Sequence, residues 1–271
     1  MMPEDRAKPV LRFEGVTVAF EGVPALQDVS FAAAEGETRV ILGAAGSGKT
    51  VLLKTALGLV QPDKGRVYVL GRDMSRMREE ERFELRSRMG MLFQESALFD
   101  SLTIEENVAY PLRNQKSIQC PEDEVRPRVE EALNFVELGA TLEKMPSELS
   151  GGMRRRAAIA RAVVTQPPLL LYDSPTAGLD PITAQTIIAL ILKERDLNRT
   201  TSLIVTHRYQ DGNLLANFRY DPKSESLVPA DHDVRTCFMV LKEGRVLFEG
   251  NQAELEASTD PYIAKFYKRR E

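Results

Sequence analysis

The chain has 271 residues, of which 43% are hydrophobic and 28% charged, a composition typical of a folded protein with a substantial core. Its net charge of −4 provides no basic field for a polyanion, so we predict no nucleic-acid partner. No apolar run approaches the roughly 20 residues that cross a bilayer, and the N-terminal segment lacks an apolar signal region, which predicts a cytoplasmic protein. The spacing of its two cysteines, Cys120 and Cys237, fits no metal or redox motif.

Alternation of apolar and polar residues and short apolar runs predict strands, and apolar residues at helical spacing predict helices between them. Expected strands cover residues 10–20, 25–33, 38–42, 65–70, 89–93, 169–173, 201–206, 238–241 and 245–248. Expected helices cover residues 50–59, 76–88, 104–112, 125–138, 154–162, 181–195 and 252–257. Residues 113–124 and 209–233 are polar, contain prolines and are predicted to be loops.

This order predicts an α/β fold with an antiparallel strand set at the N-terminus and a helical insert between two segments of the main sheet. We expect one domain over residues 10–257, with a helical subdomain at about residues 93–160 inside it. Residues 258–271 are expected to form a C-terminal tail. Basic residues from 265 to 270 are interpreted as a solvated helix end, with attraction to a membrane surface as the alternative.

The strongest motif lies between an expected strand and an expected helix, the context that a phosphate-binding loop requires. It consists of Gly43, Ala44, Ala45, Gly46, Ser47, Gly48, Lys49 and Thr50. The glycines allow backbone N–H groups to wrap a phosphate, and the helix start adds the positive end of its dipole. Lys49 is predicted to contact the β- and γ-phosphates, and the Thr50 hydroxyl to bind Mg²⁺.

Two further motifs fit the same chemistry. Asp173 ends an apolar strand, where a carboxylate can hold Mg²⁺ beside a phosphate loop. Ser150, Gly151 and Gly152 precede a helix and form a second anion-binding helix start. Because one nucleotide cannot easily use both anion sites, the second is predicted to reach the ATP of another copy.

The motif order resembles the nucleotide-binding domain of ABC transporters. That order is the phosphate loop, Gln94, residues 149–153, Asp173, residues 177–180 and His207, and the likeness covers nearly the whole chain. The resemblance implies a P-loop ABC-type core that binds ATP and Mg²⁺ and works as a homodimer or with a paired ATPase subunit. It also implies transmembrane permease subunits and a place on the inner face of the cell membrane.

The resemblance implies a role for each matching residue. Phe20 matches the aromatic that stacks on adenine, and Gln94 the glutamine that touches Mg²⁺ and the attacking water. Ser150 with its two glycines matches the signature that binds the γ-phosphate of the opposite protomer. Asp180 matches the loop that contacts the dimer partner, and His207 the switch histidine on the γ-phosphate.

A narrower resemblance links residues 91–103 and 107–112 to the ATPase subunits of MCE-type, Mla-like lipid transport systems. That subfamily implies a phospholipid or another hydrophobic cargo and an MCE-domain partner. The rival interpretation is a non-transport ABC ATPase. Such proteins usually carry two nucleotide domains or a long coiled coil, and this sequence shows one domain and no coiled-coil repeat.

One position departs from the family pattern. Ser174 follows Asp173 where an active ABC ATPase has a glutamate that acts as general base, and a serine hydroxyl is a poor base at neutral pH. Three explanations stay open. In the first, hydrolysis is slow and supported by His207 and Gln94. In the second, the protein is hydrolysis-deficient and either binds ATP as a switch or pairs with a competent partner subunit. In the third, the serine is an engineered or anomalous residue. A second departure is the long segment 209–233, interpreted as a surface loop with a partner contact as the alternative.

Overall fold

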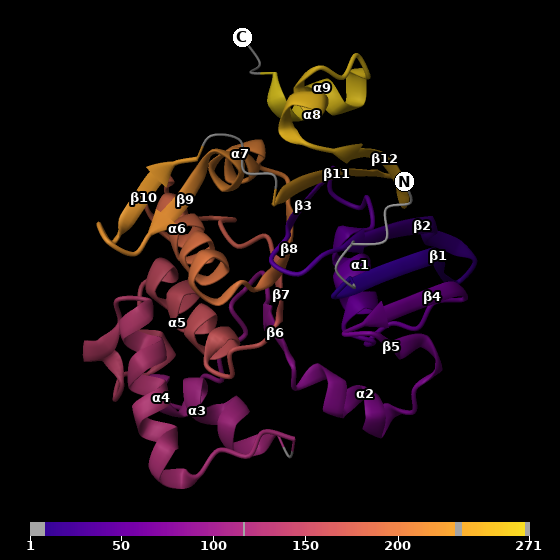
Figure 1. The fold of residues 1–271 in the computed structure, drawn as a ribbon. Coiled ribbons are helices and arrows are strands. Elements are labelled where there is room, and N and C mark those ends of the chain that lie inside the picture. Colours follow the sequence, from indigo (N-terminus) through magenta and orange to yellow (C-terminus); the bar gives the residue numbers. More distant parts are fainter. Residues whose placement is uncertain (1–8, 116, 231–234, 269–271) are drawn as a thin grey trace, which may run out of the picture.

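A six-stranded sheet runs through the middle of the molecule in the order β12-β11-β3-β8-β7-β6 (Figure 1). In the computed structural model, which describes residues 9–115, 117–230 and 235–268, the strands from β11 to β6 are parallel and β12 is an antiparallel edge. The strands are β3 (Thr38–Leu42), β6 (Met89–Leu92), β7 (Leu169–Asp173), β8 (Thr201–Thr206), β11 (Thr236–Lys242) and β12 (Arg245–Gly250). Because β3, β6, β7 and β8 run in the same direction, the loops that follow their C-terminal ends lie along the same edge of the sheet.

The middle strands have hydrophobic side chains on both faces because the sheet is covered on both sides. Every residue of β3, β7 and β8 is buried. Alternate residues point to opposite faces, so Ile41 belongs to one hydrophobic cluster while Val40 and Leu42 belong to the other.

The first face packs against an antiparallel sheet of order β2-β1-β4-β5 and helix α1 (Lys49–Ala56). Its strands are β1 (Leu11–Phe20), β2 (Val23–Ala33), β4 (Lys64–Val69) and β5 (Arg72–Asp73). Short helices η1 (Met74–Arg76) and α2 (Glu79–Arg86) lead from this sheet to β6. The predicted N-terminal antiparallel sheet is thus confirmed.

Helices cover the second face and form the insert between β6 and β7 (Figure 1). The inserted helices are α3 (Ile104–Asn114), α4 (Glu122–Phe135), η2 (Gly139–Thr141), η3 (Pro146–Glu148) and α5 (Gly151–Val163). Helix α6 (Pro181–Asn198) connects β7 to β8 and packs against α5. The predicted α/β class with an inserted helical subdomain is confirmed.

The prediction of a loop at residues 209–233 is wrong for the residues that the structure describes. Residues 209–229 form helix α7 (Tyr209–Asn217) and a hairpin of β9 (Phe218–Asp221) and β10 (Ser226–Pro229); residues 231–233 lie outside the described ranges. The Tyr220 amide donates to Asp196 Oδ2 (2.8 Å), which attaches the hairpin to α6. The two prolines favoured the loop prediction, but they are compatible with a hairpin. Pro222 lies in its turn and Pro229 at a strand end, where proline is tolerated.

Several predicted boundaries are also wrong. The helix expected at 50–59 stops at Ala56 because Gly58 takes a left-handed φ of 66°. The helix expected at 76–88 covers only α2, and α4 begins inside the loop expected at 113–124. At the C-terminus, α8 (Gln252–Glu256) is followed by α9 (Pro261–Tyr267), whose Ile263 is buried in the core. No helix in the described ranges is long and apolar enough to cross a membrane.

Candidate active site

The loop of residues 43–48 joins β3 to α1 and folds around the side chain of Lys49. Lys49 Nζ donates to the carbonyl oxygens of Gly43 and Ala44, each at 2.8 Å. Gly48 precedes the helix with φ 102°, and a Cβ there would lie 2.4 Å from the Ala25 carbonyl oxygen, so only glycine fits. The loop therefore presents a helix start, with its unpaired N–H groups, next to a fixed cation.

A cavity of about 420 Å³ opens over this loop and collects residues from five segments of the chain. Its lining consists of Ala25, Ala45, Gly46, Ser47, Gly48, Lys49, Thr50, Val51, Gln94, Asp173, Ser174, Ala177 and His207. The cavity thus brings most of the candidate phosphate-loop residues together with all four candidate catalytic residues. Gln94 and His207 are both exposed and stand in the loops after β6 and β8.

Thr50 and Asp173 supply adjacent oxygen atoms at the base of this cavity. Thr50 Oγ1 donates to Asp173 Oδ2 (3.1 Å), and the Asp173 carboxylate is 6% exposed. Hydroxyl and carboxylate oxygens, with the Gln94 amide oxygen in the same cavity, suit Mg²⁺. Burial lowers the pKa of Lys49, and the nearby Asp173 carboxylate opposes that change.

Ser174 faces the cavity directly beside Asp173. Its hydroxyl donates to Asp173 Oδ1 (3.3 Å), and its amide donates to the Val205 carbonyl (2.9 Å). The residue has φ 50°, a conformation that non-glycine residues adopt at a cost and mainly where neighbouring structure enforces it. Ser174 therefore lines the cavity with a short hydroxyl that is bonded to Asp173.

The remaining candidate residues do not line this cavity. Ser150 is the N-cap of α5, and its hydroxyl accepts from the Met153 amide (3.3 Å). Gly151 has open space where a side chain would begin, whereas a Cβ on Gly152 would lie 2.6 Å from Thr183 Cγ2. The signature glycines thus combine an accessible helix start with close packing against α6.

Asp180 and Phe20 also lie apart from the cavity lining. Asp180 is the N-cap of α6, where its Oδ1 accepts from the Ile182 and Thr183 amides and its Oδ2 from the Thr183 hydroxyl (2.6 Å). Phe20 ends β1 with 51% of its surface exposed. Contacts of these residues with a nucleotide or a second copy stay predictions.

Most residues of this cavity lie in a segment that matches a known protein family. The family model described as ABC transporter matches residues 26–177, which is more than half of the chain and includes the phosphate loop, the signature and Asp173. The chain belongs to the ABC transporter family.

Two groups of relatives are similar to this ABC cassette. The chain is 39% identical to "Probable ribonucleotide transport ATP-binding protein mkl" of Mycobacterium leprae over 73% of its own length, but it spans only 56% of that relative. It is 35% identical to the "Intermembrane phospholipid transport system ATP-binding protein MlaF" of Haemophilus influenzae, covering 86% of this chain and 81% of that protein. MlaF of Escherichia coli is 34% identical over 88% and 81% of the two chains.

Solved structures support the same fold. The ATP-binding cassette MJ0796, in a dimeric post-hydrolysis state bound to ADP and Pi, superposes with a TM-score of 0.75 at 30% identity, covering 89% of this chain and 98% of that one. The cassette cbiO1 of Clostridium perfringens, part of a cbiONQ transporter complex, gives a TM-score of 0.77 at 28% identity, covering 95% and 93%.

A buried carboxylate joins two loops of this cassette and was missed from the sequence. Asp211 Oδ2 accepts from the hydroxyls of Thr176 (2.6 Å) and Thr206 (2.9 Å), which links the segment after Asp173 to the turn that carries His207. Burial raises the pKa of Asp211, and the two threonine bonds oppose that change. The acid was overlooked because residues 209–233 were interpreted as a loop.

A second missed contact joins α9 to the phosphate loop. The Ala44 amide donates to Tyr262 Oη (3.0 Å), and Tyr262 Oη donates to the Leu241 carbonyl (3.2 Å). The C-terminal helix is therefore packed against the nucleotide side of the cassette, which the amphipathic pattern of such a short segment did not reveal.

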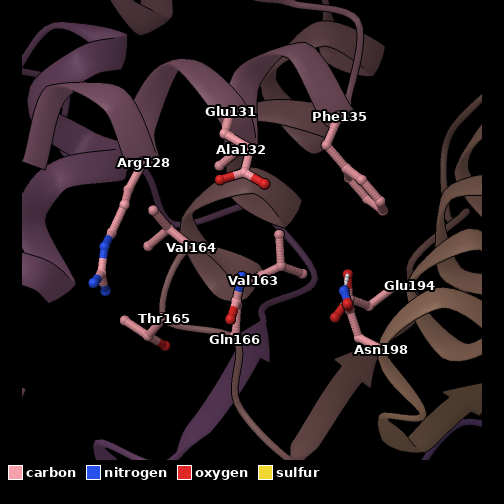
Figure 2. A pocket seen from close by; sticks show the side chains of 10 residues that line it. All are labelled: Arg128, Glu131, Ala132, Phe135, Val163, Val164, Thr165, Gln166, Glu194 and Asn198. Carbon is pink, nitrogen blue, oxygen red and sulfur yellow. Dashed lines mark hydrogen bonds between the residues drawn. The ribbon is translucent and has the colours of Figure 1, made fainter. Parts of the chain in front are cut away.

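Another cavity, of about 250 Å³, lies among α4, α5 and α6 and shares no lining residue with the first (Figure 2). Glu194 faces it with 2% of its surface exposed, and burial raises the pKa of this carboxyl. Its oxygens accept from Asn198 Nδ2 and Thr200 Oγ1, each at 3.0 Å. The Glu194 carboxyl therefore finds its hydrogen-bond partners within the protein.

Proposed function

We propose that this chain binds and hydrolyses ATP as the nucleotide-binding subunit of a lipid transporter. One observation carries the proposal: the fixed lysine, the helix start and the Thr50–Asp173 pair converge in one cavity. A triphosphate placed there would meet N–H donors and a cation on one side and hard oxygen ligands on the other. The relatives named for transport favour a transport role over a non-transport role.

Each side chain would have a defined part in binding. Lys49 would exchange its bonds to the Gly43 and Ala44 carbonyls for bonds to phosphate oxygens. Thr50 and Asp173, with Gln94, would hold Mg²⁺, which when bound neutralises charge on the β- and γ-phosphates. His207, which also lines the cavity, would donate to the γ-phosphate.

Hydrolysis is proposed to be slow. The attacking water needs a positioned base, and Ser174 offers a hydroxyl already engaged with Asp173. Gln94 and His207 line the cavity and would orient the water without accepting its proton efficiently. Nucleotide affinity does not depend on this position, so ATP binding should stay intact.

A second cassette is proposed to complete the site. Ser150 and Gly151 form an accessible helix start that does not line the cavity of their own protomer. A head-to-tail partner would bring that helix start, with its N–H donors, to the γ-phosphate. The dimeric arrangement of a similar cassette bound to ADP and Pi supports this proposal.

A groove beside Gln94 is proposed to receive the permease. It has a volume of about 480 Å³ and lies between the end of α1, the strand β6 and the inserted helices. Leu59, Phe93, Phe99 and Tyr110 line it with exposed hydrophobic surface. An apolar groove next to a catalytic loop suits a segment of a membrane subunit. A movement of the Gln94 loop would then shift the segment bound in the groove.

The cargo is proposed to be a phospholipid, with an MCE-domain protein as a further partner and the inner face of the cell membrane as the location. The likeness to two MlaF proteins over more than four fifths of the chain supports this assignment.

Affinity purification of the tagged chain from detergent-solubilised membranes of its own cells tests the assignment. We expect a multi-span permease and an MCE-domain protein to be recovered together, and Phe99→Glu to abolish the recovery. Leu247→Glu, at a 39% exposed site on β12, is the matched control and should retain both partners. Recovery of ribosomes or nucleic acid in place of a permease would contradict the transport assignment.

A further inference from the structure

Arg155 is a buried arginine that reaches from the signature helix α5 to two other loops of the site. The residue is 6% exposed, and its guanidinium donates to the carbonyls of Phe93 (3.0 Å), Gln94 and Ala177 (3.4 Å). One side chain therefore joins the helix that begins at Ser150, the loop that carries Gln94, and the segment that follows Asp173.

The loop that Arg155 holds is strained. Ser96 and Ala97 both have positive φ, 66° and 48°, a conformation that costs about 1–3 kcal/mol per residue unless the surroundings enforce it. Arg161, six residues further along α5, donates to the carbonyls of these same residues (2.9 and 2.7 Å). Two arginines of one helix thus fix the backbone of residues 93–97.

The hydrogen bonds of the buried Arg155 guanidinium go to backbone atoms. Its three acceptors are backbone carbonyls, and its Nε has no hydrogen-bond partner within the described residues. Burial lowers its pKa, with the Asp173 carboxylate opposing that change. Placing a cation here is costly, and an apolar side chain of similar length would fill the space with less desolvation.

We infer that Arg155 is a positioning residue that fixes Gln94 and the Ala177 segment relative to the signature helix. The inference rests on the proposed function for its catalytic consequence, and on geometry alone for its effect on the loop. Because Ser174 supplies no base, the orientation of the water depends more on Gln94 in this chain. Loss of Arg155 should therefore lower kcat while leaving ATP affinity unchanged.

The first test follows amide hydrogen exchange of the nucleotide-free protein. The Ser96 amide donates to the Phe93 carbonyl (2.9 Å), which is the carbonyl that Arg155 also binds. In Arg155→Met, exchange across residues 93–97 should accelerate about 10- to 100-fold, the effect of losing a charged hydrogen bond. Arg155→Lys keeps the charge but loses the planar fork, and it should give an intermediate acceleration.

Arg156→Met is the matched control. Arg156 lies on the same helix, and its guanidinium donates to the Val136 carbonyl (3.0 Å), outside the cavity. Its removal should leave exchange at residues 93–97 unchanged. Equal exchange in Arg155→Met and wild type would overturn the positioning role, whether or not the protein hydrolyses ATP.

The second test is a double-mutant cycle on single-turnover hydrolysis. Arg155→Met should lower the rate about 10- to 100-fold in wild type, as expected for a misplaced group, and have almost no effect when Gln94 is already alanine. Rate losses from the two substitutions that multiply independently, or an unchanged single-turnover rate at saturating ATP in Arg155→Met, would overturn the catalytic part. If the chain bound no ATP at all, the proposed function would fail, while the exchange result would still decide the role of Arg155.

Discussion

Replacing Ser174 by glutamate should convert this cassette into a faster ATPase. The side chain at position 174 faces the cavity next to Asp173, so a carboxylate there would reach the region of the γ-phosphate. A positioned base contributes about 10²–10⁴ in rate, which corresponds to roughly 3–5 kcal/mol of transition-state stabilisation. The gain should occur in kcat, because Lys49, Thr50 and Asp173 are unchanged.

The substitution should leave the fold intact. Serine and glutamate pay a similar cost for the φ of 50° at this position, and neither has to bury a new group in the core. Phosphate release at saturating ATP and Mg²⁺ is the assay, and Ser174→Gln is the control for side-chain size without a base. Equal rates for Ser174→Glu and wild type would refute the argument that the missing glutamate limits hydrolysis.

Three further outcomes follow from the geometry. Gly151→Asp should abolish ATP-driven dimer formation in sedimentation experiments without lowering the melting temperature, since its Cβ meets open space; a dimer that persists would contradict the second-cassette proposal. Leu171→Ala should lower the free energy of unfolding by about 2–5 kcal/mol in urea titrations, against little change for the exposed Leu247→Ala. Burial raises the pKa of Glu194 above its unfolded value, so the stability that this carboxyl contributes is full below its ordinary pKa and is lost as pH rises. Glu194→Gln should therefore gain stability relative to wild type as pH rises above the ordinary carboxyl pKa, and a difference that stays constant with pH would contradict this linkage.

Much of the fold was predictable because its signals are local. Strands β3, β7 and β8 each contain an apolar run, at residues 40–42, 169–172 and 203–205, as is typical of strands buried on both faces. The phosphate loop has a fixed spacing because Gly48 must approach the Ala25 carbonyl and Lys49 must fold back over the loop. Because few residue types meet these requirements, the phosphate loop can be recognised from the sequence.

The missed features depend on contacts between distant parts of the chain. Arg155 looks like one of three surface basic residues, and only its long-range bonds to Phe93 and Gln94 reveal a buried link. Asp211 acquires its role by packing between Thr176 and Thr206. The hairpin after α7 was hidden by prolines that proved compatible with its turn and edge. Local pattern carries no information about such pairings.

Equilibrium binding of ATP with Mg²⁺ to wild type and Lys49→Ala, measured by calorimetry, tests the central claim most directly. Loss of a charged contact to phosphate should cost about 1.5–3 kcal/mol, which weakens affinity roughly 10- to 150-fold. Lys54→Ala, an exposed lysine on the same helix, should bind as wild type does. Unchanged affinity in Lys49→Ala would contradict the assignment of this cavity as the ATP site.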